Sequence, residues 1–171
     1  MLRASPAVRL TSALTPLALL LAGCASTQQH QSATPEATSY VVTPNPSAEV
    51  DAALARATAN NTRVMLVMGA NWCHDSRALA GWLATPRFQA LVAEHYELVF
   101  INIGMPQTGD GHNIDIAQRF GLADLPGTPN LLVITADGTL VNVDTATTWR
   151  NAASRSEEAI YAELERLSAS S

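Results

Sequence analysis

The chain has 171 residues, 47% of them hydrophobic, and a formal net charge of −5 at pH 7. This length is enough for one folded domain once any targeting segment is removed. All ten basic residues are arginines, and 15 acidic residues outnumber them. Nucleic acid and anionic lipid do not attract an acidic domain, so we expect neither as an electrostatic partner.

The first 23 residues have the pattern of a bacterial export signal. Two arginines precede an apolar stretch over residues 10–21, which is too short to span a bilayer as a stable anchor. The L-A-G-C sequence that ends at Cys24 resembles the lipobox of bacterial lipoproteins, in which this cysteine is acylated and becomes the first mature residue. The resemblance implies a signal peptide over residues 1–23 and lipidation of Cys24. The alternative is an ordinary signal peptide that contains a cysteine by chance.

Residues 24–46 are rich in serine, threonine, glutamine and proline and show no hydrophobic periodicity. They bury too little apolar surface to offset the entropy cost of ordering, so we expect a flexible tether before a domain at residues 47–171. Removal of the signal peptide leaves eight basic against 15 acidic residues, a net charge near −7. Membrane attachment would then depend on the lipid alone. Ala25 and Ser26 lack the aspartate that marks inner-membrane retention in enterobacterial lipoproteins, which favours an outer-membrane anchor with the domain facing the periplasm.

The first half of the predicted domain contains a helix, a buried strand and two further helices. Ser47 is placed to cap the first helix, which ends at Asn60-Asn61. The apolar run over residues 64–68 has the length of a strand that is covered on both faces. The next helix starts at Cys73, and Thr85 is placed to cap the one after it.

The second half predicts two more buried strands, a hairpin and two helices. The strands lie over residues 97–103 and 130–135, and between them we expect a glycine-containing loop over 104–112 and a helix over 114–120 that Asn113 caps and Gly121 closes. Asp137-Gly138 signals a hairpin into a strand over residues 139–143. A capping box at Ser154 and Glu157 starts the last helix, whose apolar face carries Ile160, Leu164 and Leu167.

Cys73 is the residue on which a functional interpretation depends, because it starts a helix directly after a buried strand. Backbone N–H groups and the helix dipole stabilise negative charge there, and the thiolate is the nucleophilic form of cysteine. If Cys24 is acylated, Cys73 is the only thiol left, so any disulfide must form with another molecule. Ser76 occupies the position where a C-x-x-C motif has its second cysteine, and we include it with Cys73 among the candidate catalytic residues. A mixed disulfide on Cys73 therefore needs an outside thiol, such as glutathione or a second substrate cysteine, for its release.

The two residues that follow Cys73 have opposite effects on a thiolate. A protonated His74 favours the thiolate, which makes His74 a candidate catalytic residue, whereas the Asp75 carboxylate opposes it. The simpler interpretation of Asp75 is a first-turn acid that interacts with the helix dipole.

The element order resembles that of the thioredoxin family, and two motifs carry the resemblance. Ala70-Asn71-Trp72-Cys73 is similar to the A-x-W-C active-site entry, and Gly127-Thr128-Pro129 is similar to the G-x-P segment. The resemblance implies a thioredoxin-like α/β three-layer sandwich, with a central mixed sheet and helices on both faces. It also implies that Pro129 is cis and lies against the sulfur, that Thr128 presents backbone to a bound partner, and that Trp72 forms part of the substrate platform. Besides Ser76, one departure is Val67, which stands where the family buries an acid.

A metal site is the least favoured alternative, with Cys73, His74, Asp110 and His112 as its only candidate ligands. No pair of them has the spacing of a structural zinc site, and copper capture by thiolate and imidazole is the only version considered. We therefore predict no resident metal or cofactor. For the other aromatic and histidine residues we expect packing or solvated roles: Trp82, Trp149 and His95.

Three hypotheses of function remain. The first is a monothiol oxidoreductase of the cell envelope that acts on disulfide-bearing or glutathionylated envelope proteins and is recycled by glutathione or a dithiol reductase. The second is a non-catalytic thioredoxin-fold module that binds proteins at the membrane. The third is a metal-handling lipoprotein.

Overall fold

A three-stranded sheet forms the centre of the computed structural model, which describes Met1 and residues 34–169. The predicted signal peptide, Cys24 and the first part of the predicted tether lie outside the described residues. The strand order is β2-β1-β5. Strand β1 (Arg63–Gly69) pairs in parallel with β2 (Tyr96–Asn102) and antiparallel with β5 (Asn130–Ile134), so the sheet is mixed, as predicted.

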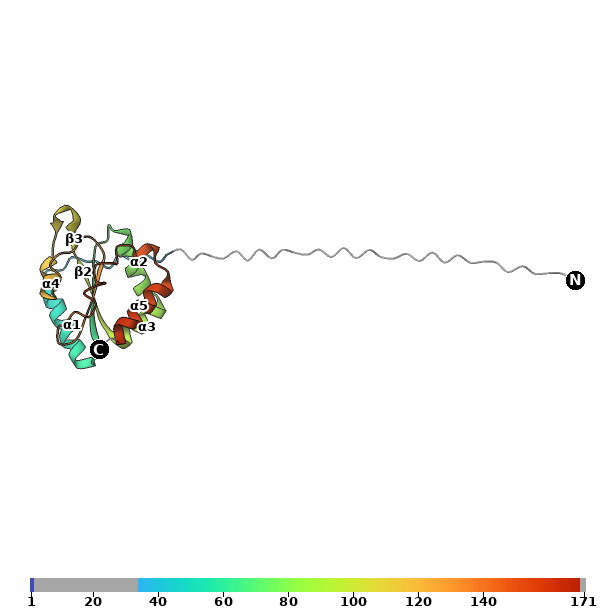
Figure 1. The fold of residues 1–171 in the computed structure, drawn as a ribbon, viewed down its shortest axis with the longest axis horizontal. Helices are drawn as coiled ribbons and strands as arrows, with labels where there is room; N and C mark the ends of the chain where they lie inside the picture. Colours follow the sequence, from blue (N-terminus) through green and yellow to red (C-terminus); the bar gives the residue numbers. More distant parts are fainter. Residues whose placement is uncertain (2–33, 170–171) are drawn as a thin grey trace. The chain divides into compact units, whose positions relative to one another are not determined.

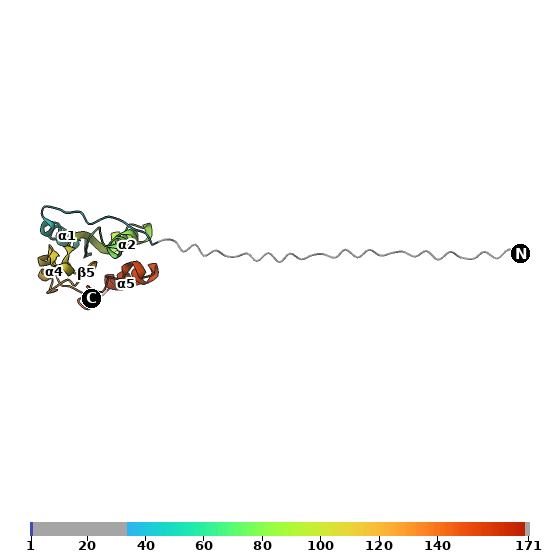
Figure 2. The same cartoon turned by 90° about the horizontal axis from the view of Figure 1, so that it is seen from above.

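Helices cover both faces of this sheet (Figures 1 and 2). On one face lie α1 (Pro46–Asn60) and α4 (Ile114–Arg119); on the other lie α2 (His74–Leu83), α3 (Pro86–His95) and α5 (Glu157–Ala169). Alternate residues of β1 enter the two cores, Leu66 on the α1 side and Met65 on the α2 side. Since successive side chains of a strand point to opposite faces, a continuous apolar run is what a strand between two helical layers requires.

Two helix caps lie two residues from where the sequence predicted them. Asn45, not Ser47, caps α1, because its Oδ1 accepts a hydrogen bond from the Ala48 N–H at 3.1 Å. Ser154 ends a short 3₁₀ turn, η2 (Ala152–Ser154), and the Ser156 hydroxyl instead accepts from the Ala159 N–H at 3.2 Å in the first turn of α5. The predicted capping box is therefore wrong, although the apolar face of α5 is buried as expected.

The predicted glycine-containing loop is a small hairpin. Strand β3 (Gly104–Met105) pairs antiparallel with β4 (Asp110–Gly111), and the 3₁₀ turn η1 (Pro106–Thr108) joins them. Gly104 and Gly109 have φ values of 61° and 88°, in the left-handed region that favours glycine. The glycines that indicated a loop therefore serve the turns of a hairpin.

The strand predicted over residues 139–143 does not form a regular ladder in the described chain. Its turn is present, and the Val141 N–H donates to the Val133 carbonyl at 2.9 Å. Beyond that point the Asn142 side chain replaces the backbone: its Oδ1 accepts from the Val133 N–H, and its Nδ2 donates to the Leu131 carbonyl, each at 2.9 Å. A side-chain amide thus satisfies the edge of β5, and only the isolated bridge between Ile134 and Leu140 remains.

The ordered domain begins before residue 47, within the predicted tether. Tyr40 is 1% exposed and packs edge-to-face on Phe100 with ring centroids 5.3 Å apart. A Cβ at Gly81 would lie 2.2 Å from the Pro35 carbonyl oxygen, so this part of the chain lies directly on α2. The prediction of a flexible tether to residue 46 is therefore wrong for residues 35–45, because one large aromatic ring supplies the burial that the polar composition lacks. None of the described helices is both long and apolar enough to cross a membrane.

Candidate active site around Cys73

Cys73 lies at the junction of β1 and α2, where it is the N-cap residue of the helix. Its N–H donates to the Ala70 carbonyl at 3.1 Å, and its carbonyl accepts the Arg77 N–H at 3.0 Å. The residue is 8% exposed. Cys73 therefore lies at the N-terminal end of α2, the end of a helix that favours negative charge, although its side chain makes no capping hydrogen bond to the first turn, and only a small part of the residue is open to a partner.

The tertiary fold places the predicted G-x-P segment against this cysteine. The Thr128-Pro129 peptide is cis, as the resemblance implied. The Cys73 Sγ donates to the Thr128 carbonyl over 3.5 Å, although the two residues are 55 positions apart. Asn130 closes the loop below them, since its Nδ2 donates to the Gly127 carbonyl at 2.7 Å. The structure therefore brings together the cysteine and the two residues predicted to receive its partner.

Ser76 lies in the interior rather than at the surface of the site. It is fully buried, and its hydroxyl accepts a hydrogen bond from the Ala70 N–H at 3.3 Å. Its carbonyl accepts the Tyr40 hydroxyl at 3.0 Å, and burial raises the pKa of that phenol. A Cβ on Gly69 would lie 2.7 Å from the Ser76 Oγ, so the strand must carry a glycine there. In this geometry Ser76 holds the strand-to-helix turn.

The charged residues that follow Cys73 both have partners. The His74 Nε2 lies 3.1 Å from a carboxylate oxygen of Glu36, in the part of the chain predicted to be a tether. Glu36 also accepts from the Arg77 Nε at 2.8 Å, and this hydrogen bond is the main cause of its lowered pKa. The Asp75 Oδ1 accepts the Ala153 N–H at 2.9 Å. His74 is thus oriented by Glu36, and Asp75 ties α2 to η2.

Trp72 is the large exposed side chain next to the cysteine. It is 51% exposed, and its indole N–H donates to the Gly104 carbonyl at 3.1 Å, which fixes the ring on the β3–β4 hairpin. Met105, the next residue of the hairpin, is 38% exposed. The two side chains present an apolar surface beside Cys73, and the substrate-platform role of Trp72 stays a prediction.

The structure does not assemble the four candidate metal ligands. The His112 Nε2 lies 3.0 Å from the Asn102 Oδ1, and the Thr108 hydroxyl donates to Asp110 at 3.2 Å. Within the described part of the chain, no three histidine, cysteine, aspartate or glutamate side chains form a group that suits a metal ion. The copper hypothesis therefore has no geometric support among these residues.

Sequence reasoning missed the network that supports the site. The Tyr40 N–H donates to the Asn71 Oδ1, and the Tyr40 carbonyl accepts from Asn71 Nδ2 and Asn102 Nδ2, all at 3.1 Å. A lone tyrosine within a polar segment was the only available signal. Arg150, whose side chain lies over Gly127, was also missed, because nothing in the sequence connects it with the G-x-P segment.

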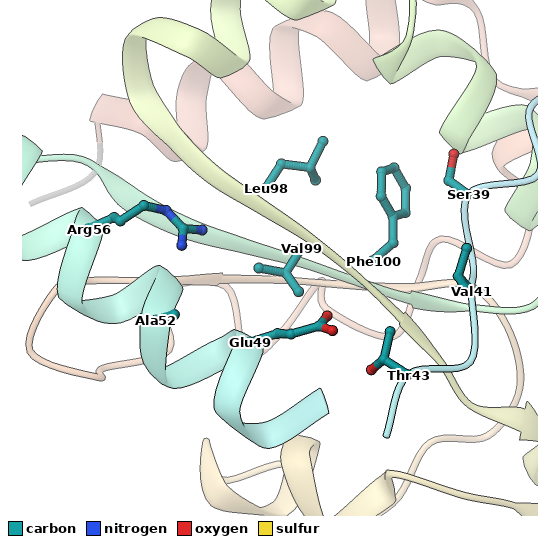
Figure 3. A pocket seen from close by; sticks show the side chains of 9 residues that line it. All are labelled: Ser39, Val41, Thr43, Glu49, Ala52, Arg56, Leu98, Val99 and Phe100. Carbon is teal, nitrogen blue, oxygen red and sulfur yellow. The ribbon is translucent and has the colours of Figure 1, made fainter. Parts of the chain in front are cut away.

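A separate pocket of about 380 Å³ lies beside β2, and its lining does not include Cys73 (Figure 3). One wall is formed by β2, another by α1, and the remainder by the segment that precedes α1. The lining residues are, in that order, Leu98, Val99 and Phe100, then Glu49, Ala52 and Arg56, then Ser39, Val41 and Thr43. Among the described residues, Glu49 and Arg56 are the ionisable groups that line it.

Comparison with known proteins agrees with this geometry. A family model described as thioredoxin-like matches residues 45–136, more than half of the chain. The chain belongs to the thioredoxin-like family. Its fold is also similar to the crystal structure of a disulphide isomerase from Xylella fastidiosa Temecula1, with a TM-score of 0.67 and 30% sequence identity over 77% of this chain and 97% of that one. No curated protein matches the chain.

Proposed function

We propose that this thioredoxin-like protein is a thiol–disulfide oxidoreductase that uses Cys73 as its single nucleophile. The observation that carries the proposal is the position of the sulfur, at the start of α2 and 3.5 Å from the carbonyl that precedes cis-Pro129. The similarity to a disulphide isomerase supports thiol–disulfide chemistry in general. Trp72 and the backbone of Thr128 bind the substrate segment.

The reaction proceeds by two exchanges at one sulfur. The Cys73 thiolate attacks one sulfur of a substrate disulfide, or the glutathionyl sulfur of a glutathionylated protein, and forms a mixed disulfide. The displaced thiolate takes up a proton. Because Ser76 carries no thiol, an outside thiolate then attacks the mixed disulfide and regenerates Cys73. His74 acts through its charge, which favours the thiolate when the imidazole is protonated.

The experiment uses the Cys24→Ser chain, in which Cys73 is the only thiol. A glutathionylated peptide serves as substrate and free glutathione as reductant, and release of the peptide thiol is followed over time. We expect catalytic turnover that disappears in the Cys24→Ser, Cys73→Ser protein. Release of the peptide thiol no faster than the uncatalysed reaction would refute the proposed enzymatic activity.

A non-catalytic binding module is the second candidate, and one observation favours it. Val67, which occupies the position of the family's buried acid, is fully buried in β1, so proton transfer to a leaving thiol lacks that group. Such a module binds its partners without thiol–disulfide exchange. Affinity for envelope proteins that is unchanged by Cys73→Ser would support it, whereas disulfide-linked partners that disappear in this variant support the oxidoreductase.

The proposed place of action is the cell envelope. The lipobox-like sequence that ends at Cys24 supports a lipid anchor, with the domain facing the periplasm from the outer membrane. Its partners there are disulfide-bearing or glutathionylated proteins. Incorporation of a labelled fatty acid that Cys24→Ser abolishes, followed by separation of the two membranes, tests both parts of this proposal.

A further inference from the structure

Arg150 lies over the loop that carries cis-Pro129. A Cβ built on Gly127 would be 2.9 Å from the Arg150 Cδ and 4.0 Å from its Nη1, so the arginine side chain crosses the backbone where there is no side chain in its way. Gly127 is bonded to Thr128, whose carbonyl contacts the Cys73 sulfur. A guanidinium therefore lies beside the segment that contacts the reactive thiol.

The charge of Arg150 has no hydrogen-bond or ion-pair partner among residues 34–169, and its side chain is exposed. The other arginines of the described chain differ in this respect, because each has a polar partner. Five make ion pairs with carboxylates, and the other two donate to carbonyl groups: Arg56, Arg77, Arg87, Arg119 and Arg166, then Arg63 and Arg155.

The other polar side chains around the sulfur are His74, Asp75 and Thr128. The His74 Nε2 lies 3.1 Å from a Glu36 carboxylate oxygen, and the Asp75 Oδ1 accepts the Ala153 N–H, so both side chains already have partners within the described chain. The Thr128 hydroxyl is buried and has no hydrogen-bond partner among the described residues. Among the described residues, Arg150 is thus the cation beside the Gly127–Pro129 loop whose hydrogen-bond donors are still available to an anion.

We propose that Arg150 binds a carboxylate of the compound that exchanges with Cys73, so that the site prefers acidic thiols and disulfides such as those of glutathione. The inference rests on the proposed function and specifies its substrate class. Arginine suits this role because its planar guanidinium matches a carboxylate with two parallel hydrogen bonds. Glutathione carries two carboxylates, and an acidic side chain beside a substrate cysteine presents the same chemistry.

In the complete reaction the Cys73 thiolate attacks the glutathionyl sulfur of a glutathionylated protein, and that protein's S–S bond breaks. The protein sulfur leaves with the electron pair and is protonated. A second glutathione thiolate then attacks the glutathionyl sulfur on Cys73, which releases oxidised glutathione and restores the Cys73 thiolate. Overall, the thiol of the one free glutathione is oxidised as the protein sulfur is reduced, and the glutathionyl group of the substrate becomes the other half of the oxidised glutathione. Arg150 holds a glutathione carboxylate in both exchanges.

The test measures only the first exchange, so it does not depend on turnover. The Cys24→Ser chain is mixed with oxidised glutathione or with the neutral bis(2-hydroxyethyl) disulfide, and formation of the Cys73 mixed disulfide is timed by mass spectrometry. Arg150→Gln is compared with Arg119→Gln, which removes an exposed arginine that pairs with Asp51.

We expect Arg150→Gln to slow the reaction with oxidised glutathione about two- to fivefold, the range of an exposed ion pair, and to leave the neutral disulfide unaffected. The difference should shrink as salt is raised, because exposed charges are screened. Arg119→Gln should change neither rate. Equal effects of Arg150→Gln on both disulfides would overturn the inference. A wild-type chain that forms the mixed disulfide but does not turn over would refute the proposed enzyme and leave the inference standing.

A second pair of probes identifies the source of the carboxylate. Two peptides carry the same disulfide with either glutamate or glutamine beside the cysteine. A preference for the glutamate peptide that Arg150→Gln removes assigns Arg150 to acidic protein segments as well. No preference between the peptides, together with the loss for oxidised glutathione, assigns it to glutathione.

Discussion

The residues around Cys73 fall into two groups that differ in burial and in hydrogen bonding. Ser76 and Tyr40 are at most 1% exposed, and their polar groups are engaged with the backbone of α2 and of Ala70, directly after β1. Trp72 and Arg150 are exposed, and Arg150 has no polar partner within residues 34–169. The buried group sets the geometry of the sulfur, and the exposed group is available to a partner. Substitutions should therefore separate stability from activity.

The largest expected effect is on the sulfur itself. Cys73→Ser should reduce exchange to the uncatalysed rate, since a hydroxyl is no substitute for the thiolate nucleophile. Stability should change little, because a serine hydroxyl at this N-cap also donates to the Thr128 carbonyl and suits a helix start. Exchange rate and urea unfolding measured on the same preparation check both statements. A large loss of stability would assign Cys73 a structural role.

Among the buried residues, Tyr40 should have the largest effect on stability when it is substituted. Tyr40→Ala should lower the free energy of unfolding by about 3–5 kcal/mol, as for other large aromatic residues in a core. Urea unfolding of the Cys24→Ser chain measures it. Val42→Ala is the matched control, because Val42 is 74% exposed in the same segment, and its effect should stay within about 0.5 kcal/mol. If both variants changed the free energy of unfolding by an equal and small amount, residues 35–45 would be part of the flexible tether and not of the folded domain.

Two variants of Ser76 distinguish its effect on stability from its effect on thiol–disulfide exchange. Ser76→Ala leaves the buried Ala70 N–H without its acceptor and should cost about 1–3 kcal/mol of stability while exchange continues. Ser76→Cys has a similar structural cost but adds a second thiol. We expect only this variant to release a Cys73 mixed disulfide without an outside thiol, as followed by mass spectrometry. Release from the Ser76→Ala protein would contradict single-thiol chemistry.

Glu36 should give the smallest effect, and one that depends on pH. The hydrogen bond from Arg77 lowers the pKa of Glu36 in the folded chain below its ordinary 4.5. A lowered folded-state pKa stabilises the fold above the unfolded-state pKa, and this contribution is lost as the pH falls through the folded-state pKa. Glu36→Gln should therefore be slightly less stable than the parent at pH 7 and converge with it as the pH falls below the folded-state pKa of Glu36. A stability difference that is constant with pH would rule out this ionic contribution.

Much of the fold followed from local patterns in the sequence. The apolar run of β1, the start of α2 at Cys73 and the N-cap position of Thr85 are where the patterns predicted them. These features depend on hydrophobic periodicity and on helix-start chemistry, which involve neighbouring residues only. Two errors are local and concern which residue caps a helix, Asn45 and Ser156. The others concern side chains that pair with backbone farther along the chain, such as Asn142 at the edge of β5.

The sequence by itself determined that a cysteine starts a helix after a buried strand and that no second thiol stands at Ser76. Only the tertiary structure decided what surrounds that cysteine. Tyr40 reaches Ser76 from 36 residues away, and Thr128 reaches Cys73 from 55 residues away. Such contacts form because the packed layers bring distant segments to one end of the sheet, and no local periodicity records them. The same packing leaves Arg150 beside the site with its charge unpaired among the described residues.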